Sequence, residues 1–237
     1  MNKTIMGLTA RALLGRKRVL MLLPMPIILI GLTLLGITSG ADDDEWGPVV
    51  FTSLGLSVIL PLTALIVGSS ALGLEIDDGT ITHLLTKPLP RSEIIFSKLI
   101  VAWLVTAAAT ALPLAAAALM AGSTSLAIGM VVGTAFGALA YSALFLALSV
   151  MTKRPVAVGL VYIMLWENLL VGFVDGARIF SVRQHATAIA DTIGNTSLIE
   201  GSVSTTTAVI MLAIFVAVGT WGATQRLRSF ALTGEAN

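Results

Sequence analysis

Long apolar runs alternate with short polar segments along this chain. Six runs are of the right length for membrane-spanning helices, because about 20 apolar residues are needed to cross the hydrocarbon core of a bilayer. They cover residues 19–39, 49–72, 94–121, 126–151, 155–174 and 205–224. Each run is continuously apolar and lacks the apolar–polar alternation of a barrel strand, so the spans are expected to be helices. The pattern predicts an all-α polytopic membrane protein with one transmembrane domain over residues 1–237.

Two amphipathic patterns lie outside the six spans. Residues 1–18 carry apolar side chains at helical spacing among basic ones, namely Ile5, Leu8, Ala12 and Leu13. This predicts an interfacial helix on the membrane face, with an ordinary basic flank as the alternative. The external segment 175–204 also has one apolar helical face, formed by Ile179, Val182, Ala186, Ile189 and Ile193. We expect a short helix there, either lying in the interface or dipping back into the membrane.

The composition agrees with a membrane protein. Of the 237 residues, 56% are hydrophobic and 11% are charged, whereas about a quarter of the residues in a soluble domain are charged. The chain has no cysteine, which excludes disulfides and thiolate chemistry. His83 and His185 share no metal-ligand spacing. Membrane lipid is therefore the expected surrounding, and neither a metal nor a nucleic-acid partner is expected.

The distribution of basic residues predicts the orientation in the membrane. If the N-terminus is cytoplasmic, twelve of the fourteen Lys and Arg side chains face the cytoplasm, and only Arg178 and Arg183 lie outside. With six spans both termini are cytoplasmic, which predicts a multi-pass protein of the cell's inner (plasma) membrane. A cleaved secretory signal within residues 1–41 is the alternative, but its apolar run exceeds the usual length of about 7–15 residues.

The segment from residue 73 to residue 93 interrupts the apolar pattern between the second and third spans. Ile81, Leu84 and Leu85 form a small apolar patch on a short predicted helix. Pro88 and Pro90 end that helix, and Ser92 is expected to cap the third span. Lys98, near the cytoplasmic end of that span, is expected to reach out to the membrane surface. Together these features predict a compact cytoplasmic surface for docking another protein.

Several residues of this segment carry a resemblance to a known family. The order Glu75, Gly79-Thr80, Leu84-Leu85, Pro88, Arg91, Lys98 is similar to the coupling segment of permease subunits in the type-2 ABC exporters. The six-span layout, the N-terminal surface helix and the helical insertion before the last span also resemble that family. One departure is the acidic pair Asp77-Asp78, where a more basic segment is expected, so the charge of the partner's groove stays open.

The resemblance implies a transport subunit without its own ATPase site. The chain contains no GxxxxGK[S/T] phosphate loop, so ATP and Mg are expected to bind to partner subunits. The implied partners are two ABC ATPase subunits and a second permease copy, in a homodimer or a paralogous heterodimer. The residues implied to couple to the ATPase are Glu75, Gly79, Thr80, Ile81, Leu84, Leu85, Pro88 and Arg91. Export, by alternating access, is implied by the resemblance alone.

The spans contain further candidate residues. Gly129, Gly133 and Gly137 form a small-residue stripe for close helix packing, against another span or a second copy. Glu167 is the one acid deep within a span, and it is either a gate or a structural hydrogen-bond acceptor. The other candidates for the translocation path or gate are Tyr141, Tyr162, Trp166 and Asn168, whose largely apolar surroundings favour a hydrophobic or amphipathic cargo.

Two other functional classes fit parts of the pattern. A proton-coupled secondary transporter would use Glu167 as its proton site, but the chain shows no internal repeat. A membrane-embedded enzyme would need clustered polar residues on one face, and the only dense acids are Asp77-Asp78 and the run 42–45. Neither alternative accounts for the segment 73–93.

Overall fold

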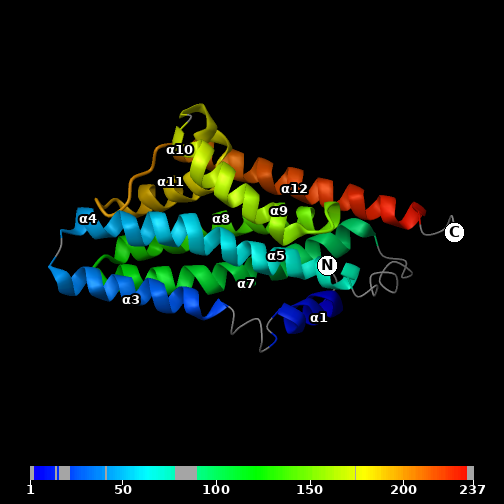
Figure 1. Ribbon diagram of the computed structural model, residues 1–237, viewed down its shortest axis with the longest axis horizontal. Helices are drawn as coiled ribbons and strands as arrows, with labels where there is room; N and C mark the ends of the chain where they lie inside the picture. Colours follow the sequence, from blue (N-terminus) through cyan, green and yellow to red (C-terminus); the bar gives the residue numbers. More distant parts are fainter. Residues whose placement is uncertain are drawn as a thin grey trace.

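The computed structural model describes residues 3–13, 15, 22–40, 42–77, 90–173 and 175–233. These residues form helices and connecting segments, and no strand occurs among them. Toward one end of the molecule lie α1 (Lys3–Leu13) and the last turns of α12 (Thr205–Thr233), and toward the other lies α4 (Asp43–Pro48) (Figure 1). The predicted all-α membrane fold is confirmed.

Five helical stretches of the described chain are long and apolar enough to cross a membrane: Glu45–Gly73, Arg91–Met120, Thr124–Met151, Pro155–Phe173 and Thr205–Ser229. They correspond to the second to sixth predicted spans. The helix within the first predicted span, α3 (Pro24–Ser39), has 16 residues, which give a length of about 24 Å at 1.5 Å per residue. The count of six spans therefore stays a prediction.

The first of these stretches changes helix type along its length. It joins α4, the π-helical segment η1 (Val49–Ile59) and α5 (Leu60–Asp77). The fifth predicted span is divided in the same way into α9 (Pro155–Val161), η2 (Tyr162–Leu170), which is again π-helical, and α10 (Val171–Phe173). The remaining spans, α7 (Arg91–Met120), α8 (Thr124–Met151) and α12, are α-helical throughout.

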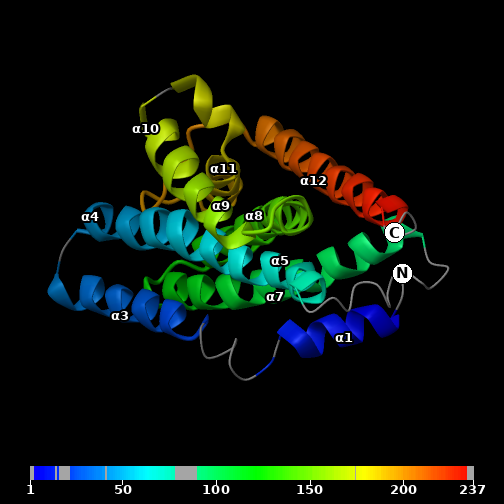
Figure 2. The same cartoon turned by 45° about the vertical axis from the view of Figure 1, so that its right-hand side comes forward.

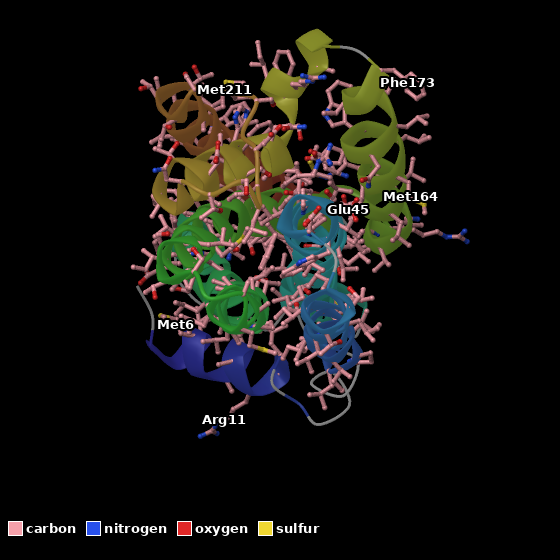
Figure 3. All side chains as sticks on the ribbon, turned by 90° about the vertical axis from the view of Figure 1, so that its left-hand side faces the viewer. Met6, Arg11, Glu45, Met164, Phe173 and Met211 are labelled. Carbon is pink, nitrogen blue, oxygen red and sulfur yellow. The ribbon has the colours of Figure 1, made fainter. Side chains whose placement is uncertain are left out.

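Helix α8 lies at the centre of the bundle, where it packs against α5, α7, α12 and the short helix α11 (Val182–Gly194) (Figures 1 and 2). Its side chains Tyr141, Phe145 and Leu146 are fully buried. In lipid, helices gain little from apolar burial itself, and van der Waals packing holds them together. The periphery is apolar as well: Met164 and Phe173 point outward from the fifth predicted span (Figure 3) and are 68% and 82% exposed.

Two local predictions near the start of α7 are wrong. The helix begins at Arg91, directly after the N-cap residue Pro90, so Ser92 lies two residues past the N-cap position and does not cap the helix. Lys98 does not reach the membrane surface, because its side chain is fully buried and donates from Nζ to the carbonyl oxygen of Ala71 in α5, 2.7 Å away. The Lys98 ammonium thus has a hydrogen-bond acceptor on the neighbouring helix, inside the protein.

Helix α1 lies along the edge of the bundle, and Arg11 points away from it (Figure 3). Its residues Ile5 and Leu13 are buried against the bundle, whereas Leu8 is exposed. Helix α12 continues beyond the predicted end at residue 224, so that Arg226 and Arg228 belong to its last turns.

Candidate functional site

The two π-helical segments are the most unusual backbone feature of the fold. In a π-helix each backbone carbonyl accepts a hydrogen bond from the amide five residues later in the chain. Such segments are rare and occur frequently at functional sites. In η1, the Ser57 hydroxyl donates to the carbonyl oxygen of Thr52 at 2.8 Å. In η2, the Asn168 amide donates to the carbonyl oxygen of Ile163 at 2.9 Å. In both cases a polar side chain donates a hydrogen bond to the backbone carbonyl five residues earlier in the wide π-helical turn.

Glu167 lies in η2 with its side chain fully buried. Its carboxylate accepts hydrogen bonds from the Tyr162 hydroxyl at 3.1 Å and the Val182 amide at 3.0 Å, and a further one from the Ser181 hydroxyl. Ser181 is the N-cap of α11 and also accepts from the amide of Gln184 at 3.2 Å. The carboxylate thus sits at the N-terminus of α11, where the helix dipole favours a negative charge. These contacts are the ones that the structural alternative for Glu167 predicts, and its role as a gate stays a prediction.

A second polar contact ties the same turn of α11 to the other π-helical segment. Arg183 donates from Nη1 to the Ser57 hydroxyl oxygen at 2.9 Å. Next to it, His185 is fully buried, and its Nε2 lies 2.7 Å from the carbonyl oxygen of Ile179. The first turn of α11 is therefore held between η1 and η2, which belong to the second and fifth predicted spans.

The glycine stripe of α8 packs against α11. A Cβ atom on Gly129 would lie 2.4 Å from the carbonyl oxygen of Ala190, and one on Gly133 would lie 2.5 Å from that of Ala186. At Gly137 the nearest atom would be the Cβ of Ala186, at 2.9 Å. All three positions thus require a residue without a side chain, and the nearest neighbour of each is α11 of the same chain.

Helix α11 lies beside a membrane-spanning helix. It follows the first half of α8 from Gly137 to Gly129, a distance of about 12 Å at 1.5 Å per residue. Figure 1 shows its first turns near the middle of the bundle and its end toward α4. This contact favours the predicted alternative in which the segment dips into the membrane over the one in which it lies in the interface, and the choice between them stays a prediction.

Aromatic side chains extend from this region across the bundle. Tyr141 and Phe145 stack with ring centroids 5.8 Å apart, and Phe145 meets Tyr162 edge to face at 6.3 Å.

The Trp166 indole donates to the carbonyl oxygen of Phe180 at 3.1 Å. A cavity of about 370 Å³ lies among Leu144, Tyr162, Trp166, Phe180 and Phe215. The structure thus brings Tyr162, Trp166 and Glu167 to one site, while Asn168 bonds within its own helix.

Only two of the predicted coupling residues, Glu75 and Arg91, lie in the part of the chain that the structure describes. Gly79, Thr80, Ile81, Leu84, Leu85 and Pro88 fall outside the described residues, and Glu75 lies in α5, near its end. Arg91 is the first residue of α7. Between these two helices, the bond from Lys98 to Ala71 is a direct polar tie close to the segment, and the sequence analysis missed it.

The sequence comparison agrees with this architecture. A family model described as ABC-2 family transporter protein matches residues 16–176, more than half of the chain. The chain belongs to the ABC-2 transporter family. No match to it is found among curated proteins. As an ABC-2 protein, it is the membrane subunit of an ABC transporter, a class that associates with ABC ATPase subunits. The matched region contains the segment 73–93, Glu167 and the glycine stripe, and it ends before α11.

Proposed function

We propose that this ABC-2 protein is the permease half of an ATP-driven exporter for a hydrophobic or amphipathic cargo. Two ATPase subunits bind ATP and Mg and dock on the segment 73–93. A second permease copy completes the path, since one set of spans encloses only half of it. The cargo class follows from the apolar lining of the cavity next to Trp166 and Tyr162.

The observation that carries this proposal is the unbroken helical connection along the second span. The helix runs without interruption from Glu45 to Gly73, and α5 continues to Asp77, within the first residues of the segment 73–93. Ser57 lies near the middle of the same stretch and accepts the hydrogen bond from Arg183 in α11. A force applied at the segment 73–93 can therefore reach α11 through one rigid element.

The mechanism that follows is a switch between two arrangements of α11. ATP draws the ATPase subunits together, and they push on the segment 73–93. The push tilts α5 together with α7, because Lys98 and Ala71 join the two helices. The tilt moves Ser57 relative to Glu167, and both residues form hydrogen bonds to the first turn of α11. Helix α11 then shifts along the glycine stripe and changes the access of the cavity to the outer side.

The docking step can be tested with Leu84→Asp/Leu85→Asp in the chain reconstituted with an ABC ATPase subunit that co-purifies with it. We expect the double variant to lose both co-purification and ATP-dependent transport. Lys153→Asp is the matched control, because it places an acid in the turn between α8 and α9 on the same predicted face. If the double variant binds the ATPase and transports as the unmodified chain does, the docking assignment is wrong.

A second measurement separates the exporter from a proton-coupled carrier. Transport by inside-out vesicles should require ATP and should persist when an ionophore collapses the proton gradient. Transport that stops with the ionophore and proceeds without ATP would instead assign the proton site to Glu167.

A further inference from the structure

A groove runs along the outer surface of α7, α8 and α12. Its deeper part has a volume of about 510 Å³, and its lining is almost entirely apolar. The lining side chains include Phe96 of α7, Phe136 and Leu139 of α8, and Val209 and Val216 of α12. All three helices are membrane-spanning candidates, so this part of the groove faces the hydrocarbon.

The groove continues into a polar hollow of about 380 Å³, and the two parts share Phe96 and Thr220. The polar hollow is lined by Ser92, Trp221, Thr224, Gln225 and Arg228. Ser92 lies in the first turn of α7, and Arg228 lies near the end of α12. The hollow is therefore at the membrane surface on the same side as the predicted coupling segment.

We propose that this groove binds an anionic phospholipid of the adjacent leaflet. An acyl chain occupies the apolar part, and the phosphate lies against the Arg228 guanidinium with the Ser92 and Gln225 side chains as further donors. An arginine fork matches the oxygens of a phosphate. Trp221 is 66% exposed and suits the headgroup level, where tryptophan is enriched in membrane proteins.

The charge of the polar hollow favours an anionic lipid over a neutral one. The residues that line it include one arginine and no acid. Arg228 forms no ion pair with any residue in the part of the chain that the structure describes. The change from apolar to polar lining along a single groove matches the shape of a phospholipid and not that of an apolar helix from a second copy.

Native mass spectrometry of the full chain tests the site. The detergent-purified protein is given equal amounts of phosphatidylglycerol and phosphatidylcholine, and the retained lipids are counted. We expect about fivefold preference for phosphatidylglycerol, the contribution of one basic residue near a membrane surface. Arg228→Ala should abolish the preference, whereas Arg154→Ala, which removes an exposed arginine at the start of α9, should retain it.

A second variant tests the apolar part of the groove. Ala213 is exposed and lines it, so Ala213→Phe should fill it and lower the retention of both lipids. Circular dichroism and gel filtration check that each variant stays folded. The proposal is overturned if the unmodified chain shows no preference or if Arg154→Ala loses it equally. It also fails if Ala213→Phe changes the oligomeric state while lipid retention stays the same, because a second copy would then occupy the groove.

Discussion

Arg183, in the first turn of α11, donates a hydrogen bond to the hydroxyl oxygen of Ser57, which lies 126 residues earlier in the chain. The contact joins two parts of the chain. One is α11, which lies between the fifth and sixth predicted spans in the sequence, and the other is the second predicted span, which leads to the segment 73–93. Glu167 holds the same turn from the other side through the amide of Val182. Movement of either span must therefore move α11 or break one of these bonds.

The first prediction concerns the strength of this link. In a double-mutant cycle with Ser57→Ala and Arg183→Met, we expect a coupling energy of about 1–3 kcal/mol, because a hydrogen bond to a charged group is stronger than one between neutral groups. The measurement is the free energy of unfolding in detergent. A cycle of Ser57→Ala with Asn168→Ala is the control and should be additive, since Asn168 bonds only to its own helix. Additivity in both cycles would show that the link carries no energy.

The second prediction concerns Glu167. Glu167→Ala removes the acceptor of three donors, two of which belong to Ser181 and Val182 at the start of α11. Each buried donor left without a partner costs about 1–3 kcal/mol. We therefore expect faster hydrogen exchange of the amides at the start of α11.

The neighbouring variant Asn168→Ala is the matched control. It shortens a polar side chain in the same π-helical segment and should leave exchange in α11 unchanged, because its contact lies within η2. Equal exchange in the Glu167→Ala variant and the unmodified chain would contradict the structural role of the carboxylate.

The sequence predicted the positions of the second to sixth spans well. It did not predict that parts of the second and fifth spans are π-helical. The predicted third span, 94–121, is observed as Arg91–Met120, and the fourth, 126–151, as Thr124–Met151. These ends follow from the length of apolar sequence, which is a local property. The π-helical turns at Ser57 and Asn168 leave the apolar content unchanged, so a hydropathy pattern carries no signal for them.

The candidate site could be predicted only in its parts. The glycine stripe and the buried acid were recognised because small residues and charges are conspicuous within apolar sequence. Their partners in α11 depend on how a distant segment folds back, which spacing along the chain does not encode. Lys98 shows the same limit. A lysine near the end of a span can reach the surface or bond inward, and the choice depends on where acceptors such as the Ala71 carbonyl lie in the folded chain.

The third prediction concerns close packing at the stripe. In a free helix, replacing glycine by alanine stabilises by roughly 0.5–1 kcal/mol. Gly133→Ala should instead destabilise the protein, because the new Cβ would lie 2.5 Å from the carbonyl oxygen of Ala186 and 2.8 Å from the Cβ of Ala190. Gly222→Ala in α12 is the control, since nothing lies within 4 Å of its Cβ position. Thermal unfolding in detergent should shift in opposite directions for the two variants.

The last prediction concerns the tie between the helices that flank the coupling segment. Lys98→Met keeps most of the length of the side chain and removes the charge-assisted bond to Ala71, a contact worth about 1.5–3 kcal/mol for a charged group. Relief of the buried charge offsets part of this cost, so we expect a modest loss of stability. Without the tie, α5 and α7 no longer tilt together. The ATPase activity of the reconstituted transporter should therefore persist while transport per ATP falls.

Lys153→Met is the matched control for this variant. Lys153 is exposed in the turn between α8 and α9, so the substitution removes the same charge without breaking a contact between the two helices. Transport per ATP should then equal that of the unmodified protein. If Lys98→Met transports with unchanged efficiency, the two helices move together for another reason, and the packing of Ile94 and Ile95 of α7, which are fully buried in one cluster with Leu72 of α5, becomes the connection to test.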